Sequence, residues 1–245
     1  MSTPRVVAVT GAGAGIGLAT ARAFTAAGTT VAGLDLREGP PTPGVTWIGC
    51  DVTDEASVGE AFAQIAATHS RLDTLVNNAG IGAKGTVETA TEDEWLGVFG
   101  VNVFGVARVS RHALPLLRHG HAPAIVNVAS TTAVAGTPQR AVYSASKGAI
   151  AALTRAMATD HIADGIRVNA VYPGAVHTDV TGRYDADRET AVRMLTERTP
   201  LGHLIDVEEI ANAIVYLADP RNTSLTGAGF RYDGGITELV NFGTA

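Results

Sequence analysis

The sequence has 245 residues, 46% of them hydrophobic and 17% charged, which excludes a disordered chain and suffices to bury a full α/β core. A net charge of −6 without any cluster of lysine and arginine argues against nucleic-acid binding. The single cysteine, Cys50, cannot form an intramolecular disulfide and is typical of a reducing compartment, and no apolar run is long enough to span a membrane.

Short β-branched runs alternate along the chain with longer alanine-rich runs, a pattern that predicts strands and helices in turn. We expect seven strands, at residues 5–10, 30–35, 45–50, 72–77, 124–130, 166–172 and 229–234. We expect helices at residues 16–28, 55–69, 92–119, 141–163 and 207–219. Strands that are apolar along their length and separated by helices indicate a parallel sheet covered on both faces. The sequence therefore predicts an α/β fold, a single doubly wound Rossmann-like domain over residues 1–245.

The start of the sequence places a basic residue before apolar ones, as a secretory signal peptide does. Four glycines interrupt that apolar run, which is typical of a strand followed by a turn. We therefore expect a cytoplasmic protein.

The first predicted strand leads into a turn with glycines at Gly11, Gly13, Gly15 and Gly17. Glycines let the backbone approach a ligand closely, and the start of the next helix offers free N–H groups and a positive dipole end, so the turn suits a pyrophosphate. The same turn can be a tight connection and nothing more. An acidic residue, Asp35, ends the second strand of this βαβ unit, and the combination favours a dinucleotide site.

Asp35 also indicates which dinucleotide is bound. Its carboxylate can accept hydrogen bonds from a ribose diol and would repel a 2′-phosphate. Leu36 offers no cation for such a phosphate, and Arg37 stands beyond the end of the strand. NAD is therefore favoured over NADP, while an aspartate that only caps a loop is the alternative.

Tyr143 and Lys147 lie four residues apart in a predicted helix and so share one of its faces. A free tyrosine titrates near ~10 and is a poor base at neutral pH. An ammonium about 4 Å away, at an effective dielectric of about 20, favours the phenolate by up to ~4 kcal/mol, or at most ~3 pKa units. The pair therefore suits a general base, and a surface pair on an ordinary helix is the alternative.

Further motifs follow in order along the chain. "CDVTD" contains Asp51, "NNAG" covers residues 77–80 and "PGAVHT" covers residues 173–178. Ser130 lies thirteen residues before Tyr143, and Asn102 lies inside the longest predicted helix. Together with the glycine turn and the Tyr–Lys pair, these motifs resemble the short-chain dehydrogenase/reductase family of the short, single-domain type, over essentially the whole chain.

The resemblance implies hydride transfer between a nicotinamide cofactor and a small-molecule secondary alcohol or ketone. It implies that Ser130 holds the substrate oxygen, that Tyr143 and Lys147 act as the proton-transfer pair, and that Asn102 helps to hold a water beside the lysine. A polar residue that merely bends its helix is the alternative for Asn102. The residues implied for cofactor binding are Gly11, Gly15, Ile16, Gly17, Asp35, Asp51, Val52, Asn78, Ala79, Gly80, Tyr143, Lys147, Pro173, Gly174, Val176 and Thr178.

One departure from the family concerns the residues between Asp35 and Asp51. Only fifteen residues separate the two aspartates, and two adjacent prolines lie among them. Relatives usually fit a short helix there, so we expect a more open adenosine edge.

Residues 177–204 are expected to form a lid over the substrate, and they contain four arginines. Arg140 stands three residues before Tyr143 and would share its face if the helix has already begun. Its guanidinium would then suit a substrate carboxylate, and an arginine here resembles relatives that oxidise hydroxybutyrate or deoxy-sugar acids. An arginine turned to solvent or to a neighbouring subunit is the alternative. The resemblance also implies a homotetramer built through the two long helices and the C-terminal segment.

Three histidines, His112, His119 and His121, end a predicted helix with no cysteine or carboxylate nearby in sequence. We interpret them as a solvated helix end and expect no metal site. His177 is expected to be an exposed loop residue. A non-catalytic NAD-binding sensor and an NADP-dependent ketoreductase are the alternative functions, and the identity of the substrate is not predicted.

Overall fold

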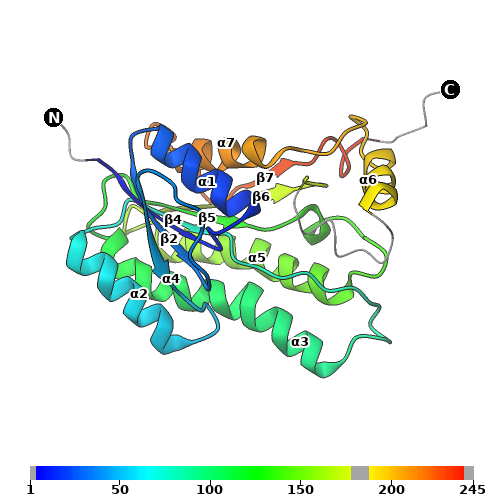
Figure 1. The fold of residues 1–245 in the computed structure, drawn as a ribbon, viewed down its shortest axis with the longest axis horizontal. Helices are drawn as coiled ribbons and strands as arrows, with labels where there is room; N and C mark the ends of the chain where they lie inside the picture. Colours follow the sequence, from blue (N-terminus) through cyan, green and yellow to red (C-terminus); the bar gives the residue numbers. More distant parts are fainter. Residues whose placement is uncertain (1–3, 178–187, 240–245) are drawn as a thin grey trace.

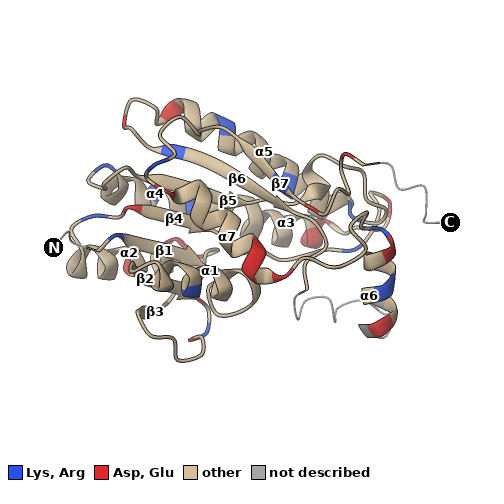
Figure 2. Ribbon diagram, turned by 90° about the horizontal axis from the view of Figure 1, so that it is seen from above, with Lys and Arg blue, Asp and Glu red and all other residues tan. Residues whose placement is uncertain are grey.

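The computed structural model describes residues 4–177 and 188–239. In this part of the chain seven parallel strands form one sheet, in the order β3-β2-β1-β4-β5-β6-β7 (Figure 2). The predicted α/β, doubly wound sheet is thus confirmed. The strands are β1 Val6–Thr10, β2 Thr30–Asp35, β3 Val45–Gly49, β4 Thr74–Asn77, β5 Ala124–Val128, β6 Arg167–Pro173 and β7 Gly229–Tyr232.

Helices cover both faces of the sheet (Figure 1). On one face lie α1 (Gly15–Ala26) and α7 (Val207–Ala218), and on the other lie α2 (Glu55–Thr68), α4 (Gly105–Leu117) and α5 (Ala141–Asp160). Each face has its own buried core, since alternate residues of the strands point to opposite sides. Two further helices, α3 (Glu92–Phe99) and α6 (Arg188–Glu197), lie beyond the carboxyl ends of the strands.

The sheet has its topological switch point at β1. The chain leaves β1 toward β2 and β3, and then returns to place β4 against the opposite edge of β1. Loops that follow β1 and β4 therefore diverge to opposite faces and leave a crevice at the carboxyl ends of these strands. Most of the motif residues follow directly after β1, β4, β5 and β6, so the fold brings them to one edge.

One stretch differs from the helices that the pattern predicts. The helix expected over residues 92–119 is interrupted by a π-helical turn, Gly100–Phe104, between α3 and α4. Residues 36–44, all of them described, form no helix, and none was predicted there although relatives usually have one. Instead the Trp47 ring packs so closely under them that a Cβ on Gly39 would lie 2.3 Å from it. That packing holds the proline-rich stretch against Trp47 of β3 without a helix.

Among the described residues, no helix combines the length and the apolar character needed to cross a bilayer.

Candidate active site

The glycine turn after β1 is shaped so that side chains would block it. Gly11 and Gly15 have φ angles of 62° and 50°, which favour glycine. A Cβ on Gly17 would lie 2.0 Å from the Gly11 carbonyl oxygen, so the first turn of α1 can pack on the loop only without a side chain. In the described part of the chain no side chain caps the start of α1, whose N–H groups are thus available to an anion. The turn fits a pyrophosphate.

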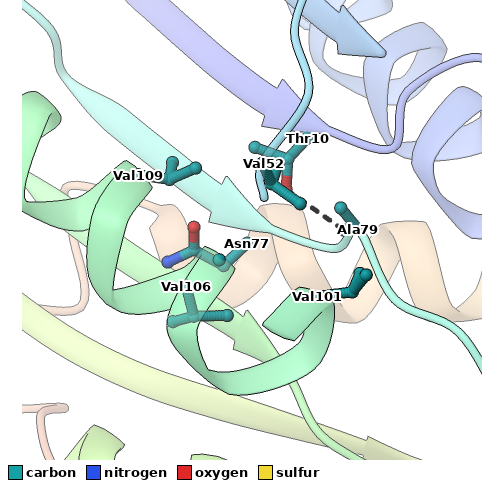
Figure 3. Close-up of a pocket in the computed structure, with 8 residues that line it drawn as sticks. Thr10, Val52, Asn77, Ala79, Val101, Val106 and Val109 are labelled. Atoms are coloured by element: carbon teal, nitrogen blue, oxygen red, sulfur yellow. Dashed lines mark hydrogen bonds between the residues drawn. The ribbon is translucent and has the colours of Figure 1, made fainter. Parts of the chain in front are cut away.

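Asn78 locks the segment after β4 to this turn. Its Nδ2 donates to the carbonyl oxygens of Thr10 and Gly11, both at 3.0 Å. In return Thr10 Oγ1 accepts from the backbone N–H groups of Asn78 and Ala79, at 3.0 and 3.1 Å. Figure 3 shows the bond from Ala79. The two strand ends on either side of the switch point are therefore held in one rigid unit.

Asp35 makes the contacts of a capping residue. Its Oδ2 accepts from the Gly13 N–H at 2.9 Å, and its Oδ1 accepts from the Arg37 N–H at 3.3 Å. The carboxylate therefore ties the end of β2 to the glycine turn, as the alternative interpretation requires. A carboxylate has about four acceptor positions, so these two bonds leave capacity for a ribose diol. Leu36 beside it is 71% exposed.

Asp51 and Val52 follow β3 at the same edge. The Asp51 carboxylate accepts from the backbone and hydroxyl of Thr53 at 2.8 and 2.7 Å, and these hydrogen bonds hold the pKa of Asp51 below its usual value. Val52 is buried and lines a narrow hollow where α4 meets the strand ends (Figure 3). The hollow is lined by Thr10, Val52, Asn77, Ala79, Val101, Gly105, Val106 and Val109.

Lys147 and Tyr143 are paired on α5. The Lys147 ammonium lies over the Tyr143 ring, 5.7 Å from its centroid, and donates to the Val128 carbonyl oxygen at 2.8 Å. The lysine is only 5% exposed, and this burial lowers its pKa from about 10.5 to about 8. Ser130, two residues after β5, is also buried, and its Oγ accepts from the Thr132 N–H at 3.2 Å. The bond to Val128 thus anchors the lysine to the strand that leads to the serine.

Asn102 lies at the centre of the π-helical turn and is 1% exposed. Its Oδ1 accepts from the Ile81 N–H at 2.8 Å and its Nδ2 donates to the Ile81 carbonyl at 2.9 Å. The same Nδ2 donates to Ser146 Oγ at 3.1 Å, and Ser146 Oγ donates to the Tyr143 carbonyl at 2.8 Å. These hydrogen bonds hold Asn102 from two sides, which accounts for the one residue more that a π-helical turn contains than an α-helical turn. The water-holding role of Asn102 stays a prediction.

Gly80 separates Asn102 from Lys147. A Cβ at this position would lie 3.2 Å from Asn102 Oδ1 and 3.5 Å from Lys147 Nζ. The glycine therefore lets the amide and the ammonium approach each other across the loop after β4. Sequence reasoning did not single out Ser146, although its spacing of three from Tyr143 places both on one helix face.

The segment after β6 is fixed from both sides. The Gly174 N–H donates to the Tyr232 carbonyl at 3.0 Å, and a Cβ on Gly174 would lie 2.7 Å from the Cα of Asp233. Val176 pairs with Ile205 in an isolated bridge. Pro173, Gly174 and Val176 thus stand at the carboxyl edge, and His177 is exposed as expected, whereas Thr178 lies outside the described residues.

Arg140 is the residue before α5 begins, so the helix has not started there. Its guanidinium donates to the Ala83 carbonyl at 3.0 Å. The backbone nearby is joined to the same loop, because the Gly85 N–H donates to the Gln139 carbonyl and the Ala141 N–H donates to the Gly85 carbonyl. Arg140 therefore ties the loop after β4 to the start of the helix that carries Tyr143. Its contact with a substrate stays a prediction.

Comparison with known proteins gives the same picture. A family model described as enoyl-(acyl carrier protein) reductase matches residues 11–237. The 2-(S)-hydroxypropyl-CoM dehydrogenase 3 of Xanthobacter autotrophicus is 38% identical, over 96% of this chain and 97% of the relative. The cis-4-hydroxycyclohexanecarboxylate dehydrogenase of Sinomonas cyclohexanicum is 37% identical, over 96% of this chain and 97% of the relative. The chain belongs to the short-chain dehydrogenase/reductase family.

A solved member of the short-chain dehydrogenase/reductase family supports the fold as well. The structure of 3-ketoacyl-(acyl-carrier-protein) reductase from Brucella melitensis, complexed with NADH, has a TM-score of 0.87 and 30% identity, covering 95% of this chain and 98% of that chain. As a member of this family, the protein is an oxidoreductase that binds a nicotinamide cofactor.

The histidines at the end of α4 are not gathered together. His112 bonds Glu55 on α2, with Nε2 2.7 Å from Oε1, and stacks on Phe62. Glu55 thus supplies a carboxylate from another helix, whereas the sequence around these histidines contains none. Among the residues that the structure describes, no group of three or more His, Cys, Asp or Glu side chains is placed to hold a metal ion.

Proposed function

We propose that the protein is an NAD-dependent oxidoreductase that transfers a hydride between nicotinamide and a secondary alcohol or its ketone. The observation that carries the proposal is the buried Lys147 ammonium over the Tyr143 ring, bonded to the Val128 carbonyl two residues before Ser130 in the chain. A buried ammonium that donates to a backbone carbonyl is costly to desolvate, and a functional site is a common reason to retain one.

The cofactor, when bound, supplies or accepts the hydride, and the residues of the chain then handle the proton. Ser130 Oγ donates to the alcohol or carbonyl oxygen and orients it. Tyr143 gives its phenolic proton to the forming alkoxide in reduction and removes the alcohol proton in oxidation. The Lys147 ammonium stabilises the phenolate that this exchange leaves behind. Asn102 and Ser146 hold the turn of α5 that carries both groups.

The test follows the absorbance of the nicotinamide ring while the protein is mixed with NAD or NADP and a panel of hydroxy acids, sugar acids and cyclic alcohols. Turnover with NAD and at least one secondary alcohol is expected. A non-catalytic sensor would bind the cofactor with no turnover on any of them. Faster turnover with NADP than with NAD would favour the ketoreductase alternative.

Cofactor choice depends on Asp35 in this proposal. Replacing it, Asp35→Ala, removes the charge that repels a 2′-phosphate, so the ratio of kcat/KM for NAD to that for NADP is expected to fall by about tenfold. The measurement is initial rates with both cofactors for the parent and the variant. A parent that already prefers NADP would contradict the assignment and would direct attention to Arg37.

Arg140 is proposed to orient a substrate carboxylate, a group that occurs in the name of the 37% identical relative. Replacing it, Arg140→Ala, should then lower kcat/KM for a hydroxy acid by the equivalent of roughly 1.5–3 kcal/mol, and much less for a neutral alcohol of similar size. If Arg140 serves only to bond the Ala83 carbonyl, its replacement would lower kcat/KM for both substrates equally. Equal losses would therefore assign Arg140 to the scaffold.

Residues 177–204, of which 178–187 lie outside the described residues, are further proposed to form the substrate lid. Four copies of the chain are proposed to assemble as a homotetramer in the cytoplasm. Small residues of α5 support the assembly, since they permit close helix approach. They are Gly148, Ala149, Ala151 and Ala152. Ala151 is buried within the subunit, so it serves the intramolecular contact.

A further inference from the structure

Three carboxylates crowd the turn between β3 and α2, where the adenosine end of the cofactor is proposed to bind. They belong to Asp51, Asp54 and Glu55. The Asp51 carboxylate accepts from the Thr53 N–H, and the Asp54 carboxylate caps α2 by accepting from the Ala56 N–H at 2.9 Å. These bonds are local, within the turn itself. None of them sets where the turn lies relative to the rest of the molecule.

Arg108 on α4 makes that connection. Its guanidinium Nη1 donates to the Val52 carbonyl at 2.5 Å, and its Nε lies 3.3 Å from Glu55 Oε2. The Arg108 side chain is 20% exposed and that of Glu55 is 54% exposed, so water screens the ion pair and the hydrogen bond to Val52 is the more sheltered contact. Arg108 also contributes to holding the pKa of Asp51 low, after the larger effect of the Thr53 hydrogen bonds.

The start of α4 is adapted to this contact. Gly105 precedes Arg108 by three residues and so lies on the same helix face. A Cβ on Gly105 would lie 3.0 Å from Val52 Cγ2 and 3.4 Å from the Val52 carbonyl oxygen. The glycine therefore lets the turn approach α4 closely enough for the guanidinium to reach its carbonyl. Val52 reaches the hollow beside Ala79 and Val101 (Figure 3).

Arg111 provides a matched comparison on the same helix. It forms an ion pair with Glu55, the acid that Arg108 also contacts, but its side chain is 65% exposed and, in the described part of the chain, it makes no hydrogen bond to the Val52 carbonyl. The two arginines therefore share the charge interaction with Glu55 and differ in the hydrogen bond to the Val52 carbonyl.

We propose that Arg108 is a positioning residue that holds the Asp51–Val52 turn in place for the adenosine end of the cofactor. The inference rests on the proposed nicotinamide-dependent function and adds a residue, on a helix remote in sequence, that controls cofactor affinity. It acts through the Val52 backbone and takes no part in the proton transfer at Tyr143.

The test is calorimetric titration of the parent, Arg108→Met, Arg108→Lys and Arg111→Met with NADH and separately with AMP. For Arg108→Met the Kd of both ligands should rise about tenfold, which equals about 1.4 kcal/mol, with kcat at saturating cofactor unchanged. Arg111→Met should leave both Kd values within about twofold of the parent, because it removes an exposed ion pair with Glu55 but no bond to the Val52 carbonyl. Arg108→Lys keeps the charge and one donor and should recover part of the loss.

Equal Kd values for the parent and Arg108→Met would overturn the inference, as would equal weakening by Arg108→Met and Arg111→Met. A fall in kcat with unchanged Kd would also overturn it. Should Arg108→Met not fold, Arg108→Lys decides the question, since parental affinity in this variant would show that the forked contact is not needed. A parent that binds neither NADH nor NADPH would overturn the proposed function and the inference with it. A parent that binds NADH no more tightly than Arg108→Met does would overturn the inference alone, so the two failures are distinguishable.

Discussion

Replacing the phenol alone, Tyr143→Phe, is expected to lower kcat by at least about two orders of magnitude, the loss typical of removing a positioned general acid/base. The substitution keeps the ring that lies beneath the Lys147 ammonium. It also keeps the backbone carbonyl that accepts from Ser146 Oγ. The fold and the NADH affinity should therefore change little, and the loss should appear in kcat.

The measurement combines steady-state rates with calorimetric binding of NADH to the same preparation. Unchanged NADH binding with a large fall in kcat would assign the loss to proton transfer by the Tyr143 phenol. A variant that retains turnover within about tenfold of the parent would remove Tyr143 from the acid/base role.

Burial of Lys147 should make the stability of the protein without cofactor depend on pH. The pKa of Lys147 is about 8 in the folded protein, against an ordinary value of about 10.5. Between these pH values the unfolded chain binds a proton that the folded chain has released, so the free energy of unfolding rises with pH. At about 1.4 kcal/mol per pKa unit, the gain is up to ~3 kcal/mol, complete near pH 10.5 and absent below pH 8.

Urea denaturation of the parent and of Lys147→Met across this range isolates the effect, because all other titrating groups are common to both proteins. The difference between their free energies of unfolding should grow in favour of the parent as the pH rises from 8 to 10.5. A difference that stays flat would show that burial does not penalise the ammonium.

Much of the fold follows from local patterns in the sequence. Apolar runs predicted every strand to within about two residues, as with β5, which ends at Val128 where the pattern extends to Ser130. The glycine turn and the Tyr–Lys pair could be predicted from the sequence because each depends on residues close together in the chain.

The features that sequence reasoning missed depend on distant partners. The π-helical turn at Asn102 arises from bonds to Ile81 and Ser146, which lie 21 and 44 residues away. Arg108 meets a carbonyl 56 residues earlier in the chain. Arg140 belongs to the loop at Ala83, 57 residues before it. Hydrophobic periodicity carries no record of such contacts, since it reports only which face of an element is buried.

The order of the strands bears on how the chain assembles as it is synthesised. β1 lies inside the sheet, and its second edge pairs with β4, so that edge stays open until the chain has grown past Asn77. From β4 onward each new strand joins the outer edge of the one before it, through β5 and β6 to β7. Growth from the ribosome therefore adds this half of the sheet strand by strand, in the order of translation. Until β7 is made, the growing edge of the sheet is an unpaired parallel strand, which the next βα unit covers. A pause in synthesis after Asn77 therefore leaves an aggregation-prone intermediate.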